Sequence, residues 1–128
     1  MKALHEILLI GCGGAVGAIS RYGLSRLGEL LSKSGFPLGT FMANMIGCLL
    51  IGMLIGSGIG QSNSHVRMAV GIGFLGALTT FSTFAAETVS LADDSKWSQA
   101  IGNVSANLVV GLILVVVGMA IGKKYLGA

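Results

Sequence analysis

Four long apolar segments constrain this chain more than any other feature, because each is long enough to cross a lipid bilayer. They cover residues 4–31, 38–60, 66–91 and 98–122. A spanning helix needs about 20 mostly apolar residues, and it satisfies its own backbone polar groups where no water is available. The sequence therefore predicts an all-α membrane protein with four transmembrane helices, forming a single integral membrane domain over residues 1–128.

The composition of the chain excludes several other classes of protein. Of its residues, 53% are hydrophobic and only 10% are charged, whereas a soluble domain carries about 25% charged residues. The net charge of +3 is dispersed and forms no basic patch that would bind nucleic acid. The two cysteines, Cys12 and Cys48, lie inside apolar segments, where reduced thiols are expected. Because the sequence contains no nucleophile with a base, no metal-ligand cluster and no nucleotide-binding motif, an enzyme is not predicted.

The third segment carries many polar side chains for its expected depth in the membrane. It has no charge from Met68 to Ala86, yet it contains glycines and four closely spaced hydroxyl groups. These hydroxyl groups belong to Thr79, Thr80, Ser82 and Thr83. Lipid does not tolerate unpaired backbone groups, so a helix at this depth breaks only where it lines a cavity or binds an ion. We therefore predict a break near Gly76–Thr80 and a role in transport.

Isolated polar residues also interrupt the second and fourth segments. Asn44 stands alone in the second segment, where its amide could donate to an anion or form an interhelical hydrogen bond. Asn103, Asn107 and Gly111 follow i, i+4, i+8 spacing on the fourth segment. A polar stripe on an apolar helix faces protein or water rather than lipid. This stripe therefore either lines an ion pathway or joins two helices.

Two charged residues lie toward the ends of their segments. Arg21 comes late in the first segment, where a long basic side chain can reach the membrane interface or an aqueous vestibule. Glu87 follows the hydroxyl groups of the third segment. It either lies near an aqueous vestibule or marks the point where the helix leaves the membrane.

Phe81 and Phe84 are three residues apart and so share one face of a helix. Phenylalanines in a membrane helix usually contact the protein core or lipid. Here they alternate with hydroxyl side chains, and an aromatic ring has a positive edge. The pair could therefore attract a small anion where hydrogen-bond donors are scarce.

The basic residues are divided almost equally between the two ends of the predicted bundle. With four spans, one end carries four basic residues and the other three or four, depending on Arg21. They are Lys2, Arg67, Lys123 and Lys124 at one end, and Arg21, Arg26, Lys33 and Lys96 at the other. Orientation follows an excess of basic residues on the cytoplasmic side. The near balance therefore predicts insertion in both orientations, which permits an antiparallel dimer resembling an inverted repeat.

Three stretches of the sequence match a known family: Gly17–Tyr22, Gly39–Gly47 and Gly73–Phe84, of which the last is highly specific. Over essentially its whole length the sequence resembles this family, the Fluc (CrcB) fluoride channels of bacterial membranes. The resemblance implies a passive fluoride channel of the bacterial inner membrane that relieves fluoride toxicity. It also implies an antiparallel, dual-topology homodimer with two pores.

The resemblance also assigns roles to individual residues. Phe81 and Phe84 would form an aromatic box on the fluoride pathway, and Asn44 would donate to the ion. Backbone oxygens of Gly76 and Thr79 from both subunits would hold a structural Na+. The remaining pathway residues implied are Thr80, Ser82, Thr83, Arg21, Asn103 and Asn107. The two helix-four asparagines stand where many members carry Tyr and Ser, and Gly111 stands where another hydroxyl is common.

Two alternative functions fit four short spans. A small multidrug-type exporter is also a dual-topology dimer, but it needs a membrane carboxylate in the first helix, and Glu6 lies too near the terminus. A non-transporting membrane protein such as a holin would leave the hydroxyl groups and phenylalanines around the predicted break without a role.

Overall fold

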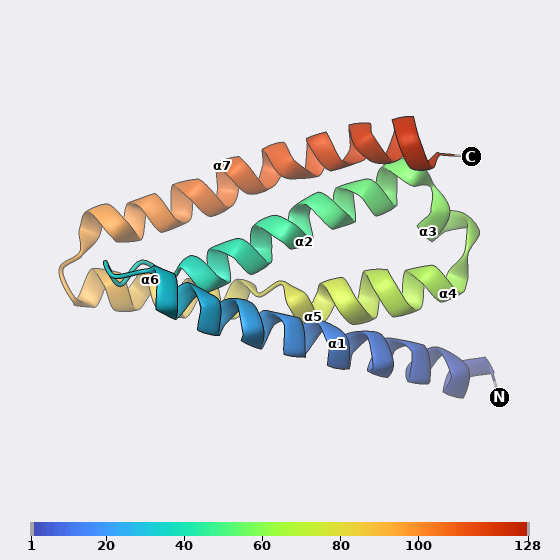
Figure 1. Ribbon diagram of the computed structural model, residues 1–128, viewed down its shortest axis with the longest axis horizontal. Helices are drawn as coiled ribbons and strands as arrows, with labels where there is room; N and C mark the ends of the chain where they lie inside the picture. Colours follow the sequence, from blue (N-terminus) through green and yellow to red (C-terminus); the bar gives the residue numbers. More distant parts are fainter. Residues whose placement is uncertain (1, 128) are drawn as a thin grey trace.

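The computed structural model describes residues 2–127, and its regular elements within that range are all helical. Four stretches are long and apolar enough to cross a membrane: Lys2–Leu31, Leu38–Ser57, Ser64–Asp93 and Trp97–Leu126. Both ends of the chain lie at the same end of the bundle, as four spans require (Figure 1). The predicted class of all-α membrane protein with four transmembrane helices is therefore confirmed.

Helix α1 covers Lys2–Leu31 and helix α2 covers Leu38–Ser57, directly after Pro37. Helix α2 ends before the predicted residue 60 because Gly58 adopts a left-handed conformation with φ of 71°. Glycine has no Cβ and takes this conformation without steric cost, so it terminates helices efficiently. The short helices α3 (Ile59–Ser62) and α4 (Ser64–Val66) then turn the chain back into the bundle.

The third span is interrupted, as predicted, but over a shorter stretch. It continues from α4 through the π-helical segment η1 (Arg67–Leu75) and the short helix α5 (Gly76–Leu78), and resumes as α6 (Phe81–Asp93). Thr79 and Thr80 are extended, with φ/ψ of −82°/153° and −151°/117°. Gly76 is helical, with φ/ψ of −63°/−32°. The unwinding is therefore confined to the two threonines rather than extending from Gly76.

Helix α7 (Trp97–Ile121) passes into a short π-helical segment, η2 (Gly122–Leu126), so the fourth span runs somewhat past the predicted residue 122. Glycines set the contact between α2 and α7. A Cβ on Gly52 would overlap the Val115 carbonyl oxygen, and one on Gly118 would overlap the Leu49 carbonyl oxygen. Small residues spaced by four thus let the two backbones approach closely, as the glycine spacing of membrane helices commonly does.

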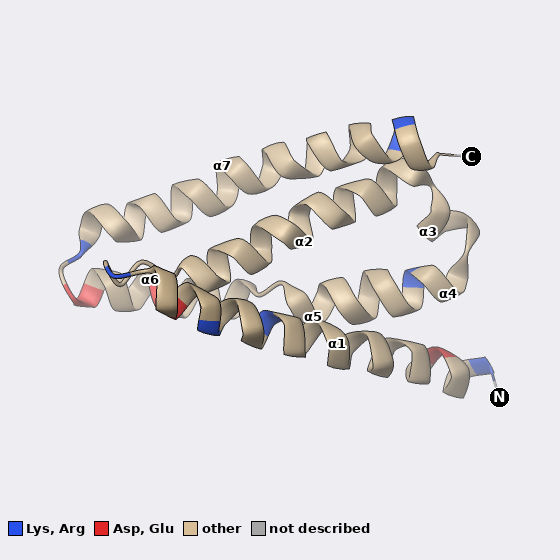
Figure 2. Cartoon of the chain, in the orientation of Figure 1, with Lys and Arg blue, Asp and Glu red and all other residues tan. Residues whose placement is uncertain are grey.

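Lysine, arginine, aspartate and glutamate residues lie toward the two ends of the bundle, and its middle carries none of them (Figure 2). Many large apolar side chains point outward along the spans; Leu30 is 80% exposed and Leu112 69% exposed. A surface of this kind is stable against lipid tails but not in water. The structure therefore supports a multi-pass membrane protein.

Candidate functional site at the helix break

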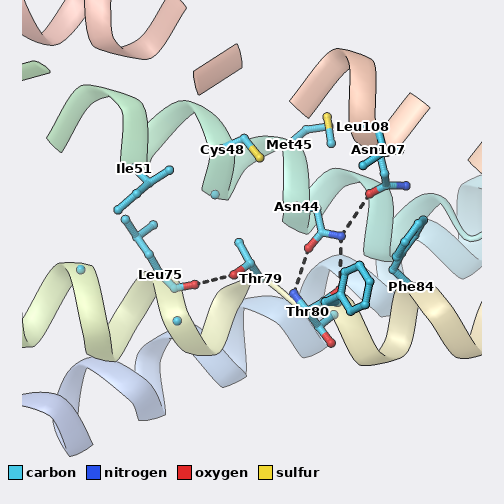
Figure 3. A pocket seen from close by; sticks show the side chains of 14 residues that line it. Asn44, Met45, Cys48, Ile51, Leu75, Thr79, Thr80, Phe84, Asn107 and Leu108 are labelled. Carbon is cyan, nitrogen blue, oxygen red and sulfur yellow. Dashed lines mark hydrogen bonds between the residues drawn. The ribbon is translucent and has the colours of Figure 1, made fainter. Parts of the chain in front are cut away.

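A groove of about 430 Å³ lies beside the break in the third span. Its walls come from α2, from η1 and α5, from the start of α6 and from α7. The groove brings together seven of the predicted site residues, with apolar neighbours such as Ile51, Leu75 and Leu108. Those seven are Asn44, Gly76, Thr79, Thr80, Phe81, Phe84 and Asn107. Figure 3 shows the Asn44 side chain between Thr80 and Asn107, joined to both by hydrogen bonds.

Asn44 holds the extended backbone of Thr80. The Thr80 N–H donates to Asn44 Oδ1 at 2.9 Å, and Asn44 Nδ2 donates to the Thr80 carbonyl oxygen at 3.3 Å. Asn44 Nδ2 also donates to Asn107 Oδ1 at 3.1 Å. Because the break removes the usual helical partners of Thr80, this side chain replaces them at membrane depth. Asn44 thus forms interhelical hydrogen bonds, one of its two predicted roles, and both of its amide hydrogens are engaged.

The two helix-four asparagines occupy different surroundings. Asn107 lines the groove, whereas Asn103 is 1% exposed and lies outside it. Asn107 Nδ2 donates to the Asn103 carbonyl oxygen at 2.9 Å and to Asn103 Oδ1 at 3.0 Å. Asn103 Nδ2 donates to Thr88 Oγ1 at 2.9 Å. The stripe therefore joins α7 to both α2 and α6, and only its central member reaches the groove.

Phe81 and Phe84 form a pair of rings at the groove wall. Their centroids lie 5.6 Å apart with an interplanar angle of 53°. Phe84 is packed inside the protomer at 8% exposure, whereas Phe81 is 76% exposed. The predicted common face is confirmed, but the rest of the protomer packs against Phe84 far more than against Phe81.

The hydroxyl groups after the break gather around Thr80. Thr80 Oγ1 donates to Thr83 Oγ1 at 3.0 Å and lies 3.4 Å from Ser82 Oγ. It also accepts from the Thr83 N–H at 3.2 Å, which caps the start of α6. Ser82 and Thr83 are exposed and do not line the groove. Their predicted place on the ion pathway therefore depends on what lies against this surface.

A second hollow, of about 410 Å³, lies between the end of α1, the start of α2 and α6. There Thr40 Oγ1 donates to Glu87 Oε1 at 2.7 Å. Glu87 Oε2 is buried without a hydrogen-bond partner in the part of the chain that the structure describes. The sequence reasoning did not select Thr40, although its position four residues before Asn44 places both on one face of α2.

Arg21 is half-buried on α1 and lines neither hollow.

The break diverts two amide groups from their usual helical acceptors. In a continuous helix the Thr80 N–H would bond to the Gly76 carbonyl and the Thr83 N–H to the Thr79 carbonyl. Here the Thr80 N–H donates to Asn44 and the Thr83 N–H donates to Thr80 Oγ1. The described residues hold no cluster of three or more His, Cys, Asp or Glu side chains suited to a metal. The oxygens at the break are therefore main-chain, hydroxyl and amide oxygens.

The fold and this groove define a small multi-pass membrane protein with a polar site at a broken helix, an arrangement typical of ion channels and transporters. The family profile described as "CrcB-like protein, Camphor Resistance (CrcB)" matches residues 8–119. The chain therefore belongs to the CrcB family, and the resemblance seen in the sequence is confirmed.

Curated relatives match over nearly their whole length. The "Fluoride-specific ion channel FluC" of Dehalococcoides mccartyi is 41% identical over 122 residues, which cover 94% of this chain and 94% of the relative. The protein of the same name from Shewanella sediminis is 40% identical over 116 residues, covering 90% and 94%. The "Fluoride-specific ion channel FluC 2" of Symbiobacterium thermophilum is 42% identical over 118 residues, covering 91% and 96%.

Proposed function

We propose that this chain is the subunit of a passive, fluoride-selective channel of the bacterial inner membrane. Family membership supports fluoride as the transported ion, since the relatives are named as fluoride-specific channels. The observation that carries the proposal is the groove in which Phe81 and Phe84 lie beside the Asn44 clamp at the helix break. The Asn44 clamp is the pair of hydrogen bonds between the Asn44 side chain and the Thr80 backbone. Ring edges and a few donors in a narrow apolar path favour a small anion.

Passive flow of fluoride through such a path would be directed outward. A negative interior drives an anion out with about 2.3 kcal/mol per unit charge for every 100 mV. No coupled ion or nucleotide is then needed to lower the internal concentration. Fluoride enters acid-exposed cells as neutral HF and ionises inside, so an exit for the anion alone relieves toxicity.

An antiparallel homodimer would complete the path. In the single protomer Phe81 is 76% exposed, and Asn44, Thr80 and Asn107 line a surface groove at membrane depth. Polar groups facing lipid are costly, which favours a second copy over this surface. The balanced basic residues at the two ends of the bundle permit the second copy to insert in the opposite orientation.

Purified protein in liposomes is expected to release fluoride when valinomycin allows potassium to balance the charge. Chloride release should be much slower, because chloride is larger and the path is narrow. A fluoride electrode and a chloride electrode on matched vesicles measure the two rates. Equal release of both ions, or no fluoride release from folded protein, would remove the basis of this proposal.

Both orientations of the chain are expected in the membrane. A cysteine-containing tag fused at the C-terminus should react with a membrane-impermeant thiol reagent from both sides of the membrane in comparable amounts. Extra lysines added at the C-terminus should shift the population toward one orientation, because they break the balance of basic residues. Labelling from one side only in the unmodified chain would contradict dual insertion.

A structural Na+ at the helix break is part of the same proposal. The break removes the usual helical donors of the carbonyls of residues 76–79, and the donors of the Gly76 and Thr79 carbonyls bond to side chains instead. Carbonyl oxygens without a donor need a partner at membrane depth, and oxygen ligands suit a hard cation. Two copies meeting at a two-fold axis would each offer both oxygens, and the bound charge would hold the two breaks together without being transported.

Removal of sodium is expected to weaken the dimer and its fluoride flux together. Protein purified throughout in a large organic cation should show reduced flux, and return of Na+ should restore it. Size-exclusion chromatography reports the dimer in the same samples. If flux and dimer were unchanged in rigorously sodium-free buffer, the ion site would have to be abandoned.

A further inference from the structure

We propose that Asn103 and Thr88, which lie outside the groove, are positioning residues that fix the amide of Asn44 and through it the break at Thr80. The proposal concerns how the proposed pathway is held in shape, and its effect on flux rests on the proposed channel function. It is carried by an unbroken series of hydrogen bonds that leaves the third span at Thr80 and returns to it at Phe84.

The first half of this series links the break to α7 through α2. The Thr80 N–H donates to Asn44 Oδ1 at 2.9 Å, and Asn44 Nδ2 donates to Asn107 Oδ1 at 3.1 Å. Asn107 Nδ2 then donates to Asn103 Oδ1 at 3.0 Å. At each step the donor belongs to the residue nearer the break.

The second half returns from α7 to α6. Asn103 Nδ2 donates to Thr88 Oγ1 at 2.9 Å, and Thr88 Oγ1 donates to the Phe84 carbonyl oxygen at 2.8 Å. The direction of donation does not change anywhere along the series. All the links therefore polarise one another in the same sense, which strengthens each of them.

The two ends determine this direction. The Thr80 N–H can only donate and the Phe84 carbonyl can only accept, since both are main-chain groups. A side-chain amide can be reversed, exchanging its oxygen and nitrogen. Reversal of Asn44, Asn107 or Asn103 would bring two donors or two acceptors together. Each amide thus has one orientation that satisfies its neighbours, fixed by the donor-only Thr80 N–H, and Thr88 supplies the acceptor that Asn103 needs at the far end.

Burial separates the residues that can meet an ion from those that cannot. Asn44 and Asn107 line the groove, whereas Asn103 is 1% exposed and lies outside it. Thr88 is half-buried and lines a separate hollow of about 300 Å³ between α6 and α7. An ion in the groove therefore meets Asn44 only after its amide has been set by the two outer residues. Because both Asn44 amide hydrogens are engaged, an anion must compete with Asn107 or with the Thr80 carbonyl for one of them.

The test combines local hydrogen exchange with fluoride flux in the full dimer. Thr88→Val removes the hydroxyl but keeps the branched shape, and Asn103→Leu removes the amide but keeps the volume. In both variants the Thr80 amide is expected to exchange about tenfold faster, because its acceptor loses support. Flux should fall by a similar factor. Thr88→Ser, which keeps the hydroxyl, should retain the Thr80 exchange rate and the fluoride flux of the unmodified protein. Ser105→Val is the matched control, because it removes an exposed hydroxyl of α7 that is outside the series.

The possible outcomes separate this proposal from the proposed function. Unchanged exchange at Thr80 in a folded Asn103→Leu dimer would overturn the positioning role. So would a loss of flux with normal Thr80 exchange, which would make Asn103 a direct ligand. Faster exchange spread evenly over α6 and α7 would indicate only a loss of packing and would also overturn it. If the unmodified chain released no fluoride, the channel function would fail, while the exchange measurement would still decide the role of the series.

Discussion

Asn44→Leu is expected to abolish fluoride flux and to destabilise the protomer more than any other single change at the groove. Leucine keeps the volume of the side chain but removes its three hydrogen bonds to Thr80 and Asn107. The Thr80 N–H and carbonyl are then left unpaired in the membrane. Each unsatisfied buried group costs about 1–3 kcal/mol, so unfolding of the variant should require about 2–6 kcal/mol less than that of the unmodified protein.

Thermal unfolding in detergent and flux from liposomes measure the two effects of Asn44→Leu. Cys48→Ala is a suitable control, because Cys48 lies one turn further along α2 and lines the same groove. The control should keep its fluoride flux and lose little stability. Normal flux in a stable Asn44→Leu protein would show that the clamp on Thr80 is not needed for conduction.

Phe81→Ile and Phe84→Ile are each expected to reduce fluoride flux by about tenfold or more, which corresponds to about 1.4 kcal/mol in the barrier. Isoleucine keeps much of the bulk but has no ring edge to attract an anion. The effects on stability should differ, because Phe84 is 8% exposed and Phe81 is 76% exposed within the protomer. Phe84→Ile should therefore lower the unfolding free energy of the protomer more than Phe81→Ile.

Leu108→Ile is the matched control for the two rings. Leu108 lines the same groove but carries no ring, and the exchange keeps its volume. Flux measured at several fluoride concentrations detects a loss of ion attraction. Chromatography of the dimer detects a misfolded sample. Flux equal to that of the unmodified protein in both phenylalanine variants would reduce the ring pair to a packing role.

The class of protein, the number of spans and the place of the break followed from the sequence by itself. These features depend on local properties: the length of each apolar segment, the position of charges, and glycine and hydroxyl residues where lipid would demand a continuous helix. The end of α2 was predicted less accurately, because the left-handed conformation of Gly58 ends the helix before the apolar pattern ends.

Only the tertiary structure decided which polar groups pair. Asn44 meets Thr80 across 36 positions of sequence and Asn107 across 63, and Thr40 meets Glu87 across 47. A residue's type indicates that it needs a partner at membrane depth but does not identify that partner, which depends on how the helices pack. For the same reason the spacing of Asn103 and Asn107 predicted one stripe, while the packing of α7 against α2 and α6 buried the first and left the second in the groove.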